Sequence, residues 1–331
     1  MTHTQMLAIG CAAILFLPPL LLAGIVSFTA LVLNPRTGAA TDYHTSALLS
    51  ATPPPLIEPT TLKIVTFNIA CAYLFTSNRP ERMREIGRVL TELDPDIVGI
   101  QESFVAKDRE ILLEALSESR LQYHADYPAA TVGNGLLTLS AYPIVENYFH
   151  RFRVNNPWYK MHQGDWWAGK GVGLARILLP DGAVVDFYNT HAQAGRGDAA
   201  NAAVRFEQMG ELAAFMNQSR TGVGPAFIVG DFNTRMGRSD LERAMSEAGL
   251  LCAMTIDSGI DFIFAAEDKR YNVETLDTIA ITGETRGSKG ALFLSRAPTP
   301  RELWRILFGP GEMTTLSDHK GFMSTIRIHP Q

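Results

Sequence analysis

Hydrophobic and polar positions are distributed differently in three parts of the chain. Residues 6–33 are almost wholly apolar, and no Asp, Glu, Lys or Arg occurs before Arg36. A helix of about 20 apolar residues crosses a bilayer, so this run predicts an N-terminal membrane anchor over residues 1–33, kinked at Pro18 and Pro19. A cleaved signal peptide is the alternative, but such a peptide usually begins with a basic region. We expect a single-pass anchor with the rest of the chain outside the cytoplasm.

Residues 34–60 are rich in Pro, Thr, Ser and Ala, with three consecutive prolines at positions 53–55. A segment of this composition buries too little apolar surface to offset the entropy lost on ordering. It therefore predicts a tether without fixed structure, followed by one folded domain over residues 61–331.

The folded domain mixes short apolar runs with helical spacings. Runs of about four to eight apolar residues predict strands, at 62–68, 97–102, 136–140, 144–153, 171–179, 184–190, 261–265 and 322–328. Apolar residues three or four positions apart predict helices, from residue 80 onward and at 108–116, 201–216 and 240–248. Turn residues predict two hairpins, across 141–143 and 180–182. Hairpins and crossovers together predict an α/β (α+β) fold of mixed sheets flanked by helices.

The stretch from Phe227 to Asn233 combines a strand with candidate chemistry. Residues 227–229 are apolar and predict a buried strand, and Gly230 is expected to permit a tight turn. Asp231 and Asn233 are two positions apart, so in an extended chain they leave the same face. A carboxylate beside an amide suits the binding of a metal, a water or a phosphate. The alternative is an ordinary polar turn after a strand.

The same pattern recurs along the domain, because other predicted strands also end in polar or ionisable residues. They are Asn68, Glu102, His191, Asp231 with Asn233, and Asp318 with His319. Carboxylates, amides and two histidines together are what a metal-assisted hydrolase needs. Oxygen ligands favour Mg²⁺, which leaves room for water and a substrate phosphate.

Six segments in this order resemble the motif set of the endonuclease/exonuclease/phosphatase superfamily. They are 66–68, 101–102, 190–191, 230–233, 260–263 and 317–319. Two further segments, 135–144 and 162–174, resemble the magnesium-dependent neutral sphingomyelinases. The resemblance covers residues 61–329 and implies a four-layer sandwich of two packed mixed β-sheets with helices outside. The apolar segment at the amino end departs from the animal pattern.

The resemblance also implies roles for individual residues. Glu102 is implied as the principal Mg²⁺ ligand with Asn68 beside it, and His319 as the general base that Asp261 orients. An imidazole suits this role because its unperturbed pKa of roughly 6.5 lies near the operating pH. The other implied roles are charge stabilisation on the phosphoryl group or support of the metal and water, by His191, Asn233, Asp231 and Asp318.

Residues 164–171 contain candidates for substrate binding. The segment is close to a phosphate-binding loop, but it lacks the Ser or Thr after Lys170 and precedes a predicted strand, so we reject nucleotide binding. Lys170 is a candidate contact for the substrate phosphate or a solvated lysine. Trp166 and Trp167 are candidates for contact with a membrane or a choline group, or for ordinary core packing.

Composition and charge exclude some classes of function. The net charge of −5 argues against a broad nucleic-acid footprint, and the spacing of the three cysteines matches no zinc pattern. We therefore predict a membrane-tethered, Mg²⁺-dependent phosphodiesterase of the sphingomyelinase C type, monomeric, acting on a sphingomyelin-like phospholipid. The alternatives are a nuclease, a phosphatase or phospholipase acting on phosphoinositides or glycerophospholipids, and a catalytically inactive binding domain.

Overall fold

The computed structural model describes residues 52–72, 76, 78–127, 133–156, 164–195, 197–286 and 313–331, with residues 21, 24 and 47–50. The predicted membrane anchor lies outside these ranges except at positions 21 and 24. Among the described residues, no helix combines the length and the apolar character needed to cross a bilayer.

The first sheet has six strands in the order β11-β14-β1-β2-β4-β3. Its central strands β1 and β2 run parallel, and the other neighbours pair antiparallel. The strand bounds are β1 Thr60–Cys71, β2 Ile97–Ser103, β3 Tyr123–Asp126, β4 Leu137–Ser140, β11 Tyr271–Ile281 and β14 Gly321–Pro330.

The second sheet has six strands in the order β5-β6-β7-β8-β10-β9. Here β7 and β8 form the parallel pair, and the other neighbours are antiparallel. The bounds are β5 Ile144–Arg151, β6 Gly171–Leu178, β7 Val184–His191, β8 Ala226–Asp231, β9 Leu250–Cys252 and β10 Asp261–Ala266. A separate two-stranded ribbon joins β12 Glu284–Arg286 to β13 Met313–Thr315.

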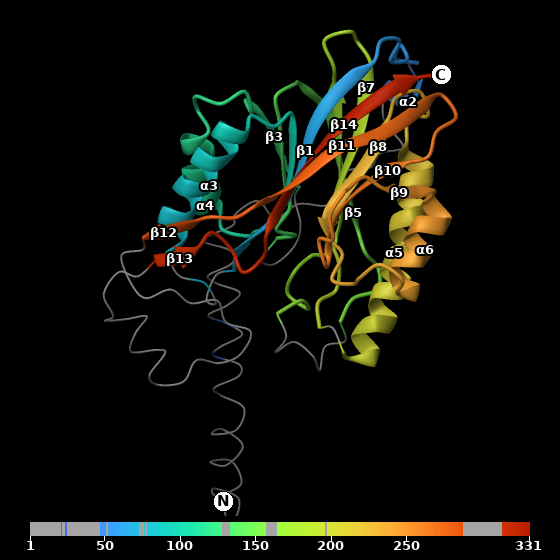
Figure 1. Ribbon diagram of the computed structural model, residues 1–331. Helices are drawn as coiled ribbons and strands as arrows, with labels where there is room; N and C mark the ends of the chain where they lie inside the picture. The colour runs from blue at the N-terminus through green and yellow to red at the C-terminus, as the bar shows by residue number, and fades with distance from the viewer. Residues whose placement is uncertain are drawn as a thin grey trace, which may run out of the picture.

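Helices cover the outer face of each sheet, so the domain has the four layers that the sequence predicts (Figure 1). On one flank lie α3 (Arg79–Leu93) and α4 (Ala106–Ala115), and on the other lie α5 (Ala199–Ser219) and α6 (Ser239–Ala248). A short helix, α2 (Ala47–Ser50), precedes the domain.

The two sheets pack face to face across an apolar layer. Strand β1 contacts β8 and β10, and β2 contacts β7 and β8. Gly99 is required where the sheets come closest, because a Cβ there would lie 2.2 Å from Cγ2 of Val229. The buried side chains of this layer include Leu62, Ile64, Phe187, Phe227, Val229, Ile263 and Ile326.

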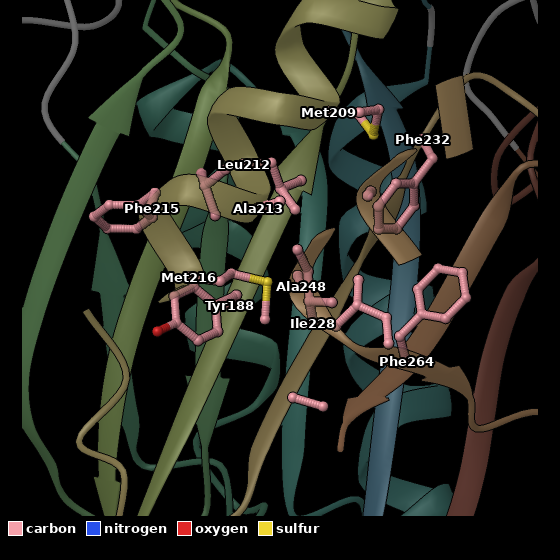
Figure 2. Packing of buried hydrophobic residues seen from close by; sticks show 14 of the residues in the cluster. Tyr188, Met209, Leu212, Ala213, Phe215, Met216, Ile228, Phe232, Ala248 and Phe264 are labelled. Atoms are coloured by element: carbon pink, nitrogen blue, oxygen red, sulfur yellow. The ribbon is translucent and has the colours of Figure 1, made fainter. Parts of the chain in front are cut away.

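The α5 and α6 layer is held on the second sheet by a large apolar cluster (Figure 2). Leu212 and Met216 of α5 are fully buried against the strands that carry Tyr188 and Ile228. Burying a side chain of this size contributes about 1.5–3 kcal/mol. The packing therefore fixes both helices on the outer face of the second sheet.

Two local predictions are wrong. Residues 141–143 do not close a hairpin: β4 pairs with β2 and β3 in the first sheet, whereas β5 pairs with β6 in the second. The chain changes sheets there, which a turn signal does not distinguish from a hairpin. Gly230 makes no tight turn but lies within β8, where a Cβ would meet the carbonyl oxygen of Thr190 at 2.1 Å. The hairpin across 180–182 is confirmed.

The last residues of the predicted tether pack onto the domain. Pro53 and Leu56 are buried, and Leu56 belongs to the apolar layer between the sheets. The Leu56 N–H donates to Oη of Tyr271 at 3.1 Å. The folded unit thus begins before residue 61, because Leu56 gains both an apolar contact and a hydrogen bond.

Candidate active site

The predicted site residues converge where the parallel strands of both sheets end. His191, Asp231 and Asp261 lie side by side across β7, β8 and β10, as Cα partners of one register. Asn68 on β1 and Glu102 on β2 come from the first sheet. Because parallel strands end at the same edge, residues far apart in the sequence meet there.

The Asn68 side chain joins the two sheets. Its Nδ2 donates to Oε1 of Glu102 and to Oδ2 of Asp231, each at 3.0 Å. Its Oδ1 accepts the N–H of Ala70 at 3.0 Å, and the Ser317 hydroxyl donates to its backbone carbonyl at 2.7 Å. Asn68 is fully buried and hydrogen-bonded through both its Nδ2 and its Oδ1, so it fixes the orientation of two carboxylates from different sheets.

Negative charge is concentrated at this edge. Burial raises the pKa of Glu102 by more than the hydrogen bond from Asn68 lowers it. Burial, and then the nearby charge of Asp261, raise the pKa of Asp231 to about 6. Burial also raises the pKa of Asp261, despite its hydrogen bond to His319. Asp318 is exposed, and its charge acts on Glu102 and Asp261.

His319 and Asp261 form a hydrogen-bonded pair, with 2.9 Å between Nδ1 and Oδ2. A proton on Nδ1 leaves Nε2, which lies 3.7 Å from Oδ2 of Asp231, as the basic nitrogen. Burial lowers the pKa of His319, but the Asp261 bond and the charges of Asp231 and Asp318 outweigh it and raise the pKa to about 10. The carboxylates around His319 therefore move its pKa away from the unperturbed value of an imidazole.

His191 is a neutral imidazole in this setting. Burial, followed by the positive charges of Lys170 and His319, lowers its pKa well below the usual value. Its Nε2 lies 3.5 Å from Oδ2 of Asp231, and its buried Nδ1 has no partner among the described residues. A neutral imidazole donates an N–H to an oxyanion but carries no full charge.

Asn233 lies beside this cluster in a left-handed backbone conformation, with φ of 52°. Its N–H donates to Oδ1 of Asp231 at 2.8 Å, and its Nδ2 donates to the carbonyl of Ala192 at 3.2 Å. The two residues predicted to act together are therefore hydrogen-bonded to each other.

Lys170 reaches the same edge but is engaged by the protein. Its Nζ donates to the carbonyl of Ala192 at 2.7 Å and pairs with Oδ1 of Asp165 at 3.0 Å. The residues after it form strand β6, as predicted, where a phosphate-binding loop would be followed by a helix. Trp166 and Trp167 are half-buried and meet edge to face, with ring centroids 4.7 Å apart.

The donor set fits a hard divalent cation. Asp231, Asp261 and His319 offer ligand atoms within 4.8 Å of one another. Oδ1 of Asp261 is buried without a hydrogen-bond partner among the described residues, and Glu102 adds another carboxylate beside Asp231. Buried carboxylates that raise one another's pKa attract a cation, and oxygen ligands suit Mg²⁺.

Sequence reasoning missed residues that hold the site together. The guanidinium of Arg82 on α3 is fully buried and donates to the carbonyls of Ile69, Ala70 and Leu316. Asp165 accepts from Lys170, from the side chain of Gln193 at 2.7 Å and from the N–H of Ala194 at 2.8 Å. Arg82 carried a readable signal, because it lies one turn before Ile86 on the apolar stripe of its helix.

Known proteins resemble this chain in sequence. A putative neutral sphingomyelinase of Drosophila melanogaster is 27% identical over 282 residues, covering 81% of this chain and 61% of that protein. An inositol phosphosphingolipids phospholipase C of Schizosaccharomyces pombe is 28% identical over 174 residues, covering 52% of this chain and 41% of that protein. The chain thus spans about three fifths of the first relative and about two fifths of the second.

Solved structures share the fold. Sphingomyelinase C from Streptomyces griseocarneus superposes with a TM-score of 0.60 at 19% identity, covering 80% of this chain and 99% of that one. A mutant beta toxin from Staphylococcus aureus with bound magnesium ions gives a TM-score of 0.60 at 17% identity, with the same coverage. The profile of the Endonuclease/Exonuclease/phosphatase family matches residues 65–319. With its two six-stranded sheets and this match over most of its length, the chain belongs to the endonuclease/exonuclease/phosphatase family.

Proposed function

We propose that this chain is a Mg²⁺-dependent phosphodiesterase of the sphingomyelinase C type, which hydrolyses a sphingophospholipid to ceramide and a phosphorylated head group. One observation carries the proposal: a single amide, that of Asn68, binds both Glu102 and Asp231, beside the His319–Asp261 pair. The names of the relatives support a lipid substrate.

Glu102 is the proposed principal ligand of the cation, and Asp231, which is bound by the same Asn68 amide, is a second candidate ligand. Asp261 is a third, because its buried Oδ1 has no hydrogen-bond partner among the described residues. Asn68 uses both N–H groups on carboxylates, so we assign it chiefly to their orientation, and its Oδ1 keeps one lone pair for a ligand. A cation bound by these residues would supply positive charge to the site and would offset the carboxylate charge that raises the pKa of His319.

The chain's own side chains then divide the reaction between them. Nε2 of His319 accepts a proton from the attacking water, whose oxygen forms a bond to phosphorus while the bond to the ceramide oxygen breaks. Asp261 holds the imidazole in the required tautomer and stabilises its charged form. The N–H of His191 and the amide of Asn233 stabilise charge on the phosphoryl oxygens, and Asp318 contributes to the charge of the site. The leaving oxygen takes up a proton from solvent and His319 releases the proton that it accepted, so that one water is added across the broken P–O bond.

Contacts with the lipid are assigned to the segment that follows Gly164. Trp166 and Trp167 present half-exposed rings, which suit a choline group or the bilayer interface. Lys170 is tied to Asp165 and Ala192, so it acts on the phosphate through its charge. An anchor at residues 1–33 would hold this monomeric domain at its membrane and raise the local substrate concentration.

The head group is the open part of the assignment. The relative from Drosophila is named for sphingomyelin and the one from Schizosaccharomyces pombe for inositol phosphosphingolipids, at nearly equal identity. An inositol-phosphate head group is therefore the second candidate on the same site.

The test is hydrolysis by the full chain in detergent mixed micelles, with Mg²⁺ and with EDTA. Sphingomyelin and an inositol phosphosphingolipid are the substrates, and phosphatidylcholine and plasmid DNA run in parallel. Glu102→Gln and His319→Ala run beside the wild type. We expect Mg²⁺-dependent ceramide release that both variants reduce by at least a hundredfold, in line with the loss of a ligand or a general base.

If the chain cleaves only DNA or phosphatidylcholine, the assignment of the metal site stands and the assignment of a sphingolipid substrate is wrong. Ceramide release that continues in EDTA would refute the metal dependence. A folded chain that turns over no phosphodiester at all would leave a binding domain as the better assignment.

A further inference from the structure

We propose that Arg205 and Asp240, an ion pair between α5 and α6, are positioning residues for the active site. They close a ring of hydrogen bonds around Asn233 and hold its amide toward the phosphoryl group. Neither side chain touches the carboxylate cluster. The expected effect on kcat rests on the proposed function, whereas the existence of the ring is tested by hydrogen exchange, which needs no activity.

One side of the ring runs through α6. Asp240 lies in the first turn of this helix, is buried, and pairs through Oδ2 with Nε of Arg205 at 3.0 Å. Its other oxygen accepts the hydroxyl of Thr234 at 2.6 Å and the N–H of Leu241 at 3.0 Å. Thr234 directly follows Asn233, so Asp240 holds the chain on the far side of the active-site amide.

The other side runs through α5. Arg205 and Gln208, three positions apart, face the same way. Nη1 of Arg205 donates to the carbonyl of Gln193 at 3.1 Å, and Oε1 of Gln208 accepts the N–H of Gln193 at 2.9 Å. Both peptide groups of Gln193 are therefore bound by the helix, which places the segment directly after His191.

The ring closes at the carbonyl of Ala192. This oxygen accepts from Nδ2 of Asn233 at 3.2 Å and from Nζ of Lys170 at 2.7 Å, and the Ala192 N–H donates to the carbonyl of Asp231. A shift of Gln193 moves this carbonyl and with it the amide of Asn233. The left-handed backbone at Asn233, with φ of 52°, persists only when its surroundings enforce it.

The ion pair can act on both segments at once because it spans the two helices. Arg205 holds the segment after His191, and Asp240 holds the segment after Asn233. A buried pair of this kind is not needed for stability as such, since well-packed apolar residues often serve equally well. The five donors of a guanidinium, however, let one side chain bind a carboxylate and a carbonyl together.

A second buried arginine–aspartate pair, which contacts the opposite end of α5, serves as the matched control. Arg176 and Asp186 form a buried pair with 3.2 Å between Nε and Oδ1, and Asp186 also accepts a threonine hydroxyl and a backbone N–H, both from Thr221. Arg176 donates to the carbonyl of Ser219, at the last residue of α5. Along the helix axis this lies about 21 Å from Arg205.

The experiment compares Asp240→Asn and Arg205→Lys with Asp186→Asn and Arg176→Lys, all in the full chain. Hydrogen exchange followed by mass spectrometry reports the segments 189–195 and 231–237, and mixed-micelle kinetics report kcat, KM and the Mg²⁺ dependence. We expect faster exchange in both segments only in the first two variants. Their kcat falls on the order of ten- to a hundredfold, as small misplacements do, with KM and half-saturating Mg²⁺ unchanged.

Thr234→Val is added because it breaks one link of the ring and keeps the ion pair, in case the charge variants fail to fold. It is expected to speed exchange in 231–237 and to lower kcat by a smaller factor. An unchanged kcat in folded Asp240→Asn or Thr234→Val would overturn the proposal, and so would an equal loss in the control variants. If the wild type hydrolyses no phosphodiester, the proposed function fails, while the exchange measurement still decides whether the ring exists.

Discussion

Replacing Arg82 by methionine tests how the strand ends are held. The guanidinium is fully buried and donates to three backbone carbonyls, two on β1 and one at Leu316, just before the segment that carries His319. Methionine has a similar length but no donor, so the substitution leaves these carbonyls without that partner. The expected effect is a large loss of stability.

The magnitude follows from the contacts. A hydrogen bond from a charged donor contributes about 1.5–3 kcal/mol, so three such bonds set an upper bound of about 9 kcal/mol. The methionine avoids the desolvation of a guanidinium, which offsets part of this loss. A buried acceptor left without a partner costs about 1–3 kcal/mol, so after this offset we expect the three carbonyls together to lower the free energy of unfolding by about 3–5 kcal/mol.

The assay is urea unfolding of the full chain in non-ionic detergent, followed by tryptophan fluorescence. At an m-value of roughly 3 kcal/mol/M, the midpoint should fall by about 1–1.7 M. Arg88→Met is the matched control, because Arg88 lies on the same helix but is exposed, and its ion pairs within the described part of the chain are with Glu85 and Glu92. It should leave the urea midpoint almost unchanged, because exposed ion pairs contribute little to stability. A loss below 1 kcal/mol in Arg82→Met would refute the reasoning.

Three further predictions concern charge and packing. Glu102→Gln should raise the thermal midpoint in EDTA at pH 7.5, because the raised pKa of Glu102 means that its charged form is disfavoured in the fold. The same substitution should remove the stabilisation by Mg²⁺, which is about 2.7 kcal/mol at a Mg²⁺ concentration of a hundred times Kd. A lower midpoint of the variant in EDTA, measured by calorimetry, would contradict this prediction. The pKa of His191 lies well below 6.5 in the fold, so the unfolded chain takes up a proton that the folded chain does not, and protonation of His191 should destabilise the fold as pH falls below about 6.5. The urea midpoint should therefore fall less between pH 7.5 and pH 5.5 in His191→Gln than in the wild type. An equal fall in both proteins would contradict this prediction. Leu56→Ala should lower the free energy of unfolding by about 2–5 kcal/mol, because this side chain is buried in the apolar layer. Ile57→Ala should change the free energy of unfolding by no more than about 0.5 kcal/mol, because Ile57 is 72% exposed. Similar losses of stability in both variants would mean that this segment does not pack as described.

The elements that carry the site were predictable because their signals are local. The strands around Asn68, Glu102 and Asp231 are short apolar runs that end in a polar residue, and all three form. Motif order then identified the family before any contact was known, and the match over residues 65–319 confirms it. Periodicity also located the helices from Arg79, Ala106, Ala199 and Ser239.

The rest depended on information that a local pattern does not contain. Residues 141–143 read as a hairpin turn, yet they carry the chain from one sheet to the other, and only the pairing partners of β4 and β5 distinguish the two cases. The pKa of His319 likewise depends on carboxylates contributed by β8 and β10. Composition predicts a tether at Leu56, whereas its hydrogen-bond partner Tyr271, which no local pattern reveals, lies 215 positions away.

The buried arginines illustrate why a site of this kind needs support from outside the sheets. Strands must end for their side chains to converge, and each ending strand leaves backbone carbonyls without a partner in the ladder. Arg82 from α3 binds such carbonyls beside Asn68, and Arg205 from α5 binds one beside His191. Each arginine lies on the buried face of its helix, at a position where an apolar residue is usual. The helices therefore do more than cover the sheets: through one guanidinium on each flank, they fix the strand ends on which the carboxylates and histidines are placed.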